Sequence, residues 1–445
     1  MLGRSFPLVG LILLTAVCCS RTSLESLSTS DSATGGAVAG GPASSTGGLQ
    51  STGGSTSMGG TLTTGGRLAT GGNAPTGGVP AFGGTTGTGG STNATLVAKS
   101  IVAGYYHSYA TMSDGAVRCW GDNGWGQLGN GMTIDSGVPV TASGITDPVS
   151  IAVGWRHICV TVSDGTVQCW GNNGYYGDLG NGTTTASLVP VTVPGVTSAV
   201  AVTAGEEYTC ALVYDGTVQC WGGNIYGNLG NGTTTASSGP VTVTAINNAV
   251  SIAASEVHTC AVLNGGAVKC WGSNSQGELG NGTTTNSPTP ITVSGITDAV
   301  AVALGGHTCA VLNGGAVKCW GSNSQGELGN GTTTNSLVPV AAIGITDAVA
   351  IAAGGGHTCA LLRGGSVQCW GDNVYGELGN GTATNSGVPV TVPGITNAVA
   401  VAAGRGHTCS LSSAGTVQCW GRNTNGELGN GTTTKSLVPV EVSGL

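Results

Sequence analysis

Short stretches in which apolar residues alternate with small or polar ones recur along most of the chain, separated by Gly-rich breaks. Between residues 348 and 397 four such stretches are visible, at 348–353, 357–362, 366–370 and 388–392. Alternation with a period of two over such short stretches predicts β-strands rather than helices. We therefore expect four short strands in this segment, the first of them rich in Ala.

This segment is one of seven copies of the same unit, which together fill residues 95–445. A Cys-Trp-Gly triplet marks every copy at intervals of 49 to 51 residues; its Cys is Cys119, Cys169, Cys220, Cys270, Cys319, Cys369 or Cys419. Four strands per repeat, in a series of such repeats, are the signature of a β-propeller. The sequence thus predicts an all-β fold, a seven-bladed β-propeller built from seven repeats of about 50 residues.

The second and third strands of each unit are expected to form a hairpin. In the sixth copy a three-residue loop, Arg363-Gly364-Gly365, sets Cys359 opposite Cys369, and its third residue is Gly in all seven copies. Gly adopts the left-handed conformation that such a loop needs, and opposed strand residues have Cβ atoms at disulfide spacing. The register predicts six disulfides: Cys159–Cys169, Cys210–Cys220, Cys260–Cys270, Cys309–Cys319, Cys359–Cys369 and Cys409–Cys419.

Two other interpretations of these Cys pairs remain open. They are reduced core residues if the compartment is reducing, or metal ligands, although Cys-x9-Cys is not a usual zinc spacing. The first copy has Tyr109 where the other six have the first Cys, so Cys119 is expected to be unpaired.

One string of residues is specific enough to resemble a known family. His357-Thr-Cys-Ala-Leu, followed by Gly365-x-Val367-x-Cys-Trp370-Gly371-x-Asn373-x-x-Gly376-x-Leu378-Gly379-x-Gly381, resembles the regulator-of-chromosome-condensation repeat. The resemblance implies a seven-bladed propeller. Founding eukaryotic members of the family are nuclear exchange factors for a small GTPase and bind chromatin, while secreted bacterial relatives include inhibitors of β-lactamase. The Cys pairs are similar to those of the exported bacterial variety.

The N-terminal segment has the features of an export signal. Arg4 precedes an apolar stretch at residues 6–17, which matches a secretory signal peptide and is too short to span a bilayer. Cys18 and Cys19 follow at once, and a Cys there resembles the lipid-attachment box of bacterial lipoproteins. We expect residues 1–19 to direct export, with Cys18 or Cys19 as the lipidation site, which makes the protein a cell-envelope lipoprotein or a secreted protein.

Residues 20–94 differ in composition from everything that follows. They are rich in Gly, Ser and Thr, repeat a Thr-Gly-Gly unit and contain Phe82 as their one aromatic residue. Such a segment cannot bury enough apolar surface to offset its ordering entropy. We expect a disordered, flexible linker that holds the propeller away from a membrane; the alternative is low-complexity sequence without a function.

The charge balance limits the class of partner. The chain has 12 Lys and Arg residues against 20 Asp and Glu residues, a net charge of -8. Nucleic-acid binding depends on basic patches, so no nucleic-acid partner is expected. We also expect no membrane contact beyond an N-terminal lipid, and a monomer.

Side chains that could carry out catalysis recur at repeat positions, which favours structural roles. All six His residues share one position: His107, His157, His258, His307, His357 and His407. Glu278, Glu327, Glu377, Glu427 and Asp178 share another, and a recurring Asn-Gly-Thr matches both a glycosylation sequon and a turn pair, of which we favour the turn. A catalytic residue is usually unique, so we predict no enzymatic activity, no cofactor and no metal site.

Residues that break the repeat gather in two sets of loops. In an antiparallel meander the loop from the first to the second strand and the loop from the third to the fourth lie on one rim. In the first three copies these loops contain the candidate binding residues Tyr105, Tyr106, Trp125, Trp155, Arg156, Tyr175, Tyr176, Glu206, Glu207 and Tyr226. Clustered Trp, Tyr and Arg residues are typical of interface hot spots, although drift in surface loops would also produce such variation.

The sequence therefore favours a non-enzymatic, exported or surface-displayed scaffold that binds a protein, peptide or glycan through one propeller rim. The resemblance keeps two alternatives open: a guanine-nucleotide exchange factor for a small GTPase, and a secreted inhibitor of the β-lactamase-inhibitor type. The export signal, the acidic chain and the uniform repeat length, which leaves no room for the exchange factors' inserted hairpin, weigh against exchange activity.

Overall fold

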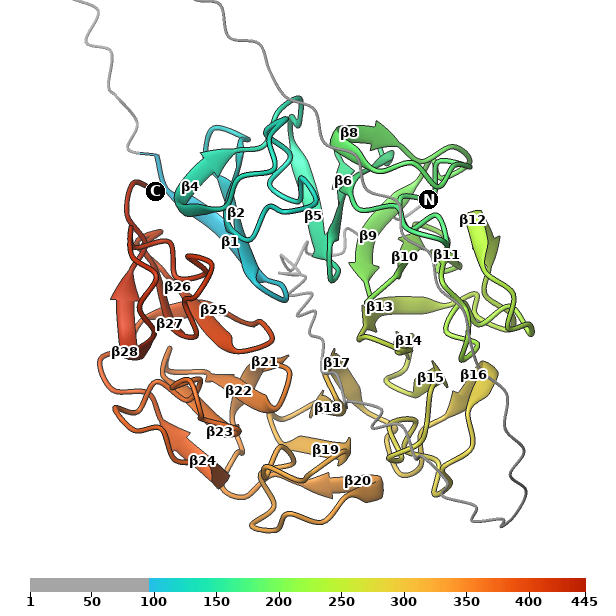
Figure 1. Ribbon diagram of the computed structural model, residues 1–445. Coiled ribbons are helices and arrows are strands. Elements are labelled where there is room, and N and C mark those ends of the chain that lie inside the picture. The colour runs from blue at the N-terminus through green and yellow to red at the C-terminus, as the bar shows by residue number, and fades with distance from the viewer. Residues whose placement is uncertain (1–95) are drawn as a thin grey trace, which may run out of the picture. The chain divides into compact units, whose positions relative to one another are not determined.

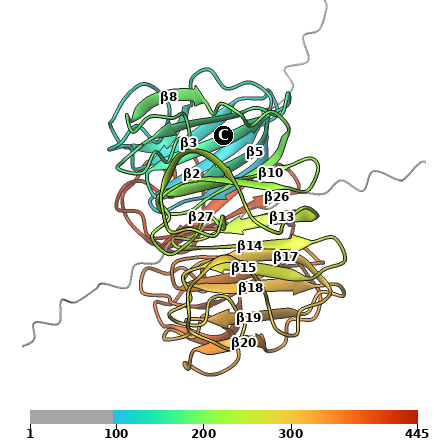
Figure 2. The ribbon, with the colours of Figure 1, turned by 90° about the vertical axis from the view of Figure 1, so that its right-hand side faces the viewer.

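The computed structural model describes residues 96–445, which form seven four-stranded antiparallel sheets. Neighbouring strands of a sheet are consecutive in the chain, so each repeat folds into one blade. The blades stand around a central axis with their first strands innermost (Figure 1), and edge-on the sheets extend from one rim of the ring to the other (Figure 2). The predicted all-β, seven-bladed propeller is confirmed, whereas the predicted signal peptide (1–19) and linker (20–94) lie outside the described residues.

Every strand has five or six residues. The first strands are β1 Ala98–Ala103, β5 Pro148–Val153, β9 Ala199–Ala204, β13 Ala249–Ala254, β17 Ala299–Leu304, β21 Ala348–Ala353 and β25 Ala398–Ala403. The second strands are β2 His107–Met112, β6 His157–Val162, β10 Tyr208–Val213, β14 His258–Leu263, β18 His307–Leu312, β22 His357–Leu362 and β26 His407–Ser412. The third strands are β3 Val117–Gly121, β7 Val167–Gly171, β11 Val218–Gly222, β15 Val268–Gly272, β19 Val317–Gly321, β23 Val367–Gly371 and β27 Val417–Gly421. The fourth strands are β4 Ser136–Thr141, β8 Ser187–Thr192, β12 Ser237–Thr242, β16 Ser287–Thr292, β20 Ser336–Ala341, β24 Ser386–Thr391 and β28 Ser436–Glu441.

The hairpin between the second and third strands forms as the sequence predicts. Cys359 lies opposite Cys369, and Gly365 closes the loop with a φ of 81°. The limits of the outer strands differ slightly from expectation, because β24 begins at Ser386 instead of residue 388. Ser386 pairs with Gly371 across an irregularity in the register, which extends the outermost strand toward its loop.

Six disulfides join the second and third strands of blades 2 to 7. The pairs are Cys159–Cys169, Cys210–Cys220, Cys260–Cys270, Cys309–Cys319, Cys359–Cys369 and Cys409–Cys419, as predicted. The open interpretations as reduced residues or metal ligands are therefore wrong for this structure. Disulfides persist in oxidising compartments, so the six bonds indicate an oxidising environment.

Neighbouring blades are joined by a recurring pair of hydrogen bonds. Between blades 5 and 6, the main-chain carbonyl of Glu327 accepts from Trp370 Nε1 at 2.7 Å and from Thr358 Oγ1 at 2.9 Å. The Trp370 ring covers Gly329, where an added Cβ would come within 2.8 Å of Nε1. Residue 329 must therefore be Gly, because a side chain there would displace the Trp370 ring from the Glu327 carbonyl.

The same carbonyl position serves all seven interfaces. The residues whose main-chain oxygen accepts from a Trp Nε1 of the next blade are Gln127, Asp178, Asn228, Glu278, Glu327, Glu377 and Glu427. The last of these interfaces closes the ring, because Trp120 of blade 1 donates to Glu427 of blade 7 at 2.8 Å. No strand is exchanged there, since β28 pairs with β27 of its own repeat. The ring therefore closes with the interaction that joins every other pair of blades.

The interface between blades 1 and 2 differs from the others at two positions whose substitutions compensate for each other. Ile158 stands where the other blades have Thr or Ser, so it cannot donate to the carbonyl of Gln127. Tyr109 does so instead, through its hydroxyl at 2.7 Å. Because Tyr109 takes the place of the first Cys, its partner Cys119 is the free cysteine of residues 96–445 and donates its Sγ–H to the carbonyl of Leu128 at 2.9 Å.

The secondary-structure elements assigned in residues 96–445 are all strands. No helix in these residues is long and apolar enough to cross a membrane.

Thiol labelling tests this account of the cysteines. Cys119 is fully buried, and burial raises the pKa of its thiol, so both access and thiolate formation are suppressed in the folded protein. We expect no propeller cysteine to react with iodoacetamide under native conditions and Cys119 alone to react after denaturation without reductant, as read by peptide mass spectrometry. Labelling of any of the other twelve before reduction would contradict the disulfides.

Candidate functional site

The candidate site lies on one rim of the ring. Because every blade is an antiparallel meander, the loop joining its first and second strands (the inner loop) and the loop joining its third and fourth strands (the outer loop) share a rim. We call this the aromatic rim; the other two connections form the opposite rim. The ten candidate binding residues all belong to the aromatic rim.

Stacked cationic and aromatic side chains connect blades 1 and 2. The guanidinium carbon of Arg156 lies 3.6 Å from the ring centre of Trp155 and 5.1 Å from that of Trp125. The Trp155 ring in turn lies 5.7 Å from Tyr105. The Tyr105 and Tyr106 ring centres lie 5.2 Å apart, so Tyr105, Tyr106, Trp125, Trp155 and Arg156 form one contact cluster, in which 44% of the Trp125 surface remains exposed.

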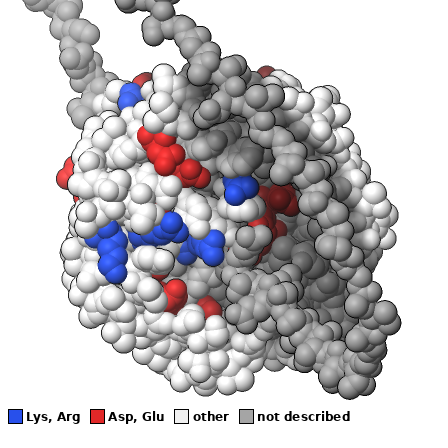
Figure 3. Space-filling view, viewed as in Figure 1, with Lys and Arg blue, Asp and Glu red and all other residues white. Residues whose placement is uncertain are grey.

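The cluster continues across the ring closure into blades 6 and 7. Arg422 lies 4.1 Å above the ring of Tyr106 and 5.7 Å from that of Tyr375, and Arg405 donates from Nη1 to the Tyr106 hydroxyl at 3.0 Å. Lys435 lies 6.0 Å from the ring of Tyr375. On the face shown in Figure 3, basic side chains gather over this side of the ring.

Sequence reasoning did not include these four residues among the binding candidates. They belong to the last two repeats, about 300 residues from Tyr106, and only closure of the ring brings them beside it. The available signal was that Arg405 and Tyr375 depart from the residues at the matching positions of other copies.

Tyr105 is buried, contrary to the expectation that it is part of an exposed cluster. Only 1% of its surface is exposed, and its hydroxyl donates to Glu256 Oε1 of blade 4 at 2.8 Å. Tyr105 therefore crosses the mouth of the ring instead of facing outward.

The remaining candidates are spread over blades 2 and 3. Tyr175 is 95% exposed and Tyr226 is also exposed, while Tyr176 packs beside Gly223 of the next blade. Glu206 and Glu207, in the inner loop of blade 3, are half-buried. Tyr175 and Tyr226 therefore face solvent, while Tyr176 takes part in the packing between blades.

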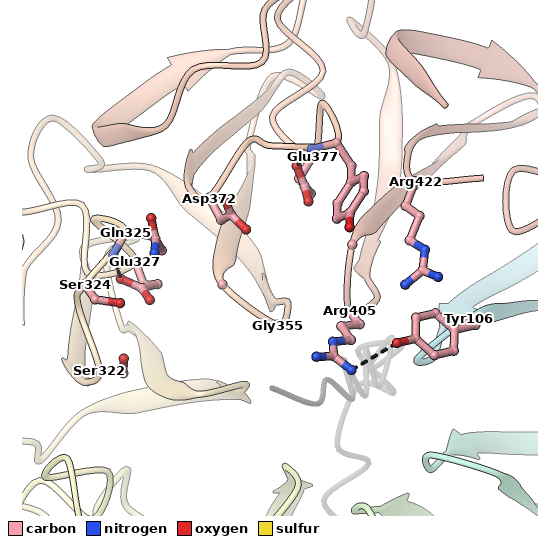
Figure 4. Close-up of a pocket in the computed structure, with 13 residues that line it drawn as sticks. Tyr106, Ser322, Ser324, Gln325, Glu327, Gly355, Asp372, Glu377, Arg405 and Arg422 are labelled. Atoms are coloured by element: carbon pink, nitrogen blue, oxygen red, sulfur yellow. Dashed lines mark hydrogen bonds between the residues drawn. The ribbon is translucent and has the colours of Figure 1, made fainter. Parts of the chain in front are cut away.

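A cavity of about 500 Å³ opens beside the basic end of the cluster. It lies over blades 5 to 7 and the inner loop of blade 1, and its charged lining residues are Glu327, Asp372, Glu377, Arg405 and Arg422 (Figure 4). Burial raises the pKa of Glu377 to about 7, and the nearby Asp372 carboxylate adds to the effect. The main-chain N–H of Tyr375 donates to Glu377 Oε2 at 2.9 Å, which fixes the carboxyl group at the cavity wall.

A second buried carboxyl group lies on the other side of the ring. Burial and the nearby carboxylate of Glu207 raise the pKa of Asp178 to about 8, so Asp178 is largely protonated at neutral pH. Its Oδ1 atom has no hydrogen-bond partner. Blade 3 has Asn228 at the matching position, which indicates that the position requires a polar group and not a charge.

The recurring His residues are structural, as the sequence predicted. His307 Nε2 and the Thr358 hydroxyl are 2.6 Å apart across the blade interface, and four further His residues make the same contact with Thr or Ser. Because the Thr358 proton is donated to the Glu327 carbonyl, His307 must donate from Nε2. Burial lowers the pKa of all six His residues to about 3.

The Asn-Gly pairs are turns. Asn181 Oδ1 accepts from the main-chain N–H of Thr183 at 3.1 Å, and the matching Asn residues of the other blades do the same. Blade 1 keeps the turn with Met132 in place of Thr, so the turn does not depend on the sequon. In residues 96–445 no group of three His, Cys, Asp or Glu side chains lies close enough together to hold a metal ion.

Comparison with known proteins gives one family. A model of the RCC1-like domain matches residues 197–445, and models of the regulator of chromosome condensation (RCC1) repeat match residues 98–127, 149–177, 114–161 and 164–212. No curated protein sequence matches the chain significantly.

Three solved structures with a TM-score of 0.66 share the fold. Yeast RCC1 (Prp20), in complex with Kap60, is 21% identical over 74% of this chain and 83% of its own. Prp20p from Saccharomyces cerevisiae is 20% identical over 78% and 88%, and human WBSCR16 is 22% identical over 74% and 94%. At this level of identity the likeness concerns the fold alone.

The buried His and carboxyl groups predict a stability maximum near neutral pH. The stabilisation from neutral His is present above the unfolded pKa of 6.5 and is lost as the pH falls toward 3, because only the unfolded chain takes up protons there. Protonated Asp178 and Glu377 act in the opposite sense, and their stabilisation is lost as the pH rises through about 8 and 7. We expect the free energy of unfolding, measured in urea, to fall on both sides of about pH 6–7.

The substitution Asp178→Asn separates the two effects. It should reduce the loss of stability between about pH 7 and pH 8 and make the loss below pH 6.5 steeper, because protonated Asp178 opposes the His effect at every pH between its unfolded and folded pKa values. A free energy of unfolding that stays constant between pH 4 and pH 7 would contradict the burial of six neutral His residues.

Proposed function

The chain belongs to the family of RCC1-like domains, and on that premise we propose that its propeller is a non-enzymatic scaffold that binds a protein, peptide or glycan through the aromatic rim. The observation that carries the proposal is the continuous series of stacked Arg, Trp and Tyr side chains from Trp125 to Lys435. Tyr, Trp and Arg are the residues enriched at interface hot spots.

The rim also combines rigidity with exposure, which suits recognition. The guanidinium groups of Arg156 and Arg422 are each held between two aromatic rings, so they lose little freedom on binding. Trp125, Tyr175, Ile225 and Tyr226 extend into solvent from the outer loops of blades 1 to 3. Exposed apolar side chains rimmed by polar residues are typical of interaction sites.

The positions of the residues that could carry out catalysis support a non-enzymatic role. The His residues, the Asn residues of the turns and four of the eight Glu residues in 96–445 recur in the blades and are used in turns or blade contacts. The residues that distinguish one blade from another are mostly aromatic or Arg. This distribution supports binding over catalysis.

The six disulfides support a role outside the reducing cytosol. We propose that the protein is exported, either secreted or held at the cell envelope by a lipid on Cys18 or Cys19, and that it acts as a monomer. Prp20p, one of the solved structures with this fold, binds Gsp1p and histones. At 20% identity the likeness to Prp20p concerns the fold and does not indicate the same partners for this chain.

Partner capture by rim variants tests the proposal. The full chain, immobilised, is incubated with envelope extract of its source cells, and the variants Trp125→Ala and Tyr175→Ala are compared with it by quantitative mass spectrometry. Each should weaken capture of the same partner by about 1–3 kcal/mol, roughly 5- to 150-fold, if the residue is a hot spot. Both side chains are exposed, so the fold should not change.

Tyr214→Ala is the matched control, since Tyr214 is an 84% exposed Tyr on the opposite rim. It should leave capture unchanged. Equal losses from Tyr175→Ala and Tyr214→Ala would contradict binding through the aromatic rim. Faster nucleotide release from a small GTPase would favour an exchange factor instead.

A further inference from the structure

The cavity beside the basic end of the aromatic rim has opposite charges on its two sides. Glu327, Asp372 and Glu377 come from the outer-loop regions of blades 5 and 6, whereas Arg405 and Arg422 come from blade 7 (Figure 4). The acidic and basic groups thus face a shared space of about 500 Å³, within the size range of small-ligand sites (~300–1,000 Å³).

Asp372 supplies the negative charge of the acidic side, because burial raises the pKa of Glu327 and raises that of Glu377 to about 7. The ion pair described in residues 96–445 joins Arg422 Nε to Glu427 Oε1 at 3.4 Å, and Glu427 does not line the cavity. Glu327 and Glu377 each accept one main-chain N–H at Oε2, and Asp372 accepts one weakly at 3.4 Å. Asp372 is half-buried, so its remaining oxygen lone pairs can accept from a cationic ligand group, whereas Glu327 and Glu377 are buried in the cavity wall.

The basic side is positioned by aromatic rings. Arg422 lies between Tyr106 and Tyr375, and Arg405 is hydrogen-bonded to the Tyr106 hydroxyl. Arg422 Nε donates to Thr424 Oγ1 at 2.8 Å, so the edge formed by its two Nη groups is the one that can bind a carboxylate in a bidentate manner. An anionic ligand group would meet a prepared partner here.

The same stacking argues against a sugar as the ligand. Recognition of a neutral sugar uses the open face of an aromatic ring, and Arg422 covers a face of Tyr106 at 4.1 Å. Peptides, in contrast, carry both ammonium and carboxylate side chains on one short chain. A ligand with a single sign of charge would be attracted by one side and repelled by the other.

We propose that this cavity binds a peptide segment that carries a cationic and an anionic side chain close together, with the cation toward Asp372 and the carboxylate toward Arg405 and Arg422. The proposal rests on the proposed function of the rim and names the chemistry of its ligand. Specificity arises because only a ligand with both charges complements both sides.

Three blocked tripeptides test the proposal with the full chain by isothermal titration calorimetry. Acetyl-Lys-Gly-Glu-amide carries both charges, acetyl-Lys-Gly-Gln-amide only the positive one, and acetyl-Gln-Gly-Glu-amide only the negative one. We expect the doubly charged peptide to bind at least about 10-fold more tightly than either analogue, and added salt to reduce the difference.

Two variants assign the two sides. Asp372→Asn should abolish the advantage of Lys over Gln in the peptide, and Arg405→Gln should abolish the advantage of Glu over Gln. Arg363→Gln, at an exposed Arg in a hairpin loop of the opposite rim, is the control and should change neither preference.

Equal affinity of the three peptides, or a preference that both variants leave intact, would overturn the proposal. Binding of maltotriose where the peptides do not bind would overturn it in favour of a glycan site. Its failure is distinguishable from failure of the proposed function, because loss of partner capture in Trp125→Ala and Tyr175→Ala does not depend on the cavity.

Discussion

One main-chain carbonyl per blade joins the ring together. In blade 5 it belongs to Glu327, and it accepts both the Trp370 indole N–H and the Thr358 hydroxyl of blade 6. Both bonds are buried, where a lost partner costs about 1–3 kcal/mol because the carbonyl cannot return to water. The Trp ring, the Gly beneath it and a second hydroxyl donor are therefore constrained together at every interface; that donor is Thr at five interfaces, Ser108 at the ring closure and Tyr109 between blades 1 and 2.

This constraint separates the part of each repeat that must be kept from the part that is free to vary. The inner and outer loops lie beside the blade contact, but most of their side chains take no part in it. Loop residues such as Trp125, Arg405 and Tyr375 could therefore diverge between blades without weakening the ring. The proposed binding site is made of these divergent residues, and its continuity from blade 6 to blade 2 depends on the closure between blades 7 and 1.

The interface between blades 1 and 2 shows how strictly two donors are required. Where Ile158 replaces the Thr, Tyr109 provides the second hydrogen bond to Gln127, and a disulfide is lost in exchange. His107 has no hydrogen-bond partner at either ring nitrogen as a result. The free Cys119 is thus the consequence of a packing substitution, not a reactive site.

Local features of the fold could be predicted from the sequence, because they depend on residues near each other in the chain. The hairpin with Gly365 and the opposition of Cys359 and Cys369 follow from spacing alone. Features that depend on ring closure could not be predicted. Arg422 contacts Tyr106 from the other end of the chain, and Tyr105 turns inward to reach Glu256 of blade 4, although its loop position suggested an exposed residue.

The most direct test of the account compares the closing interface with an internal one. Trp120→Phe removes the donor to Glu427 between blades 7 and 1, and Trp370→Phe removes the donor to Glu327 between blades 5 and 6. In urea titrations followed by far-UV circular dichroism, we expect both variants to lose a similar free energy of unfolding, about 1–3 kcal/mol each. A loss in Trp370→Phe with none in Trp120→Phe would show that the ring is closed by something other than this bond, and no loss in either would contradict the account.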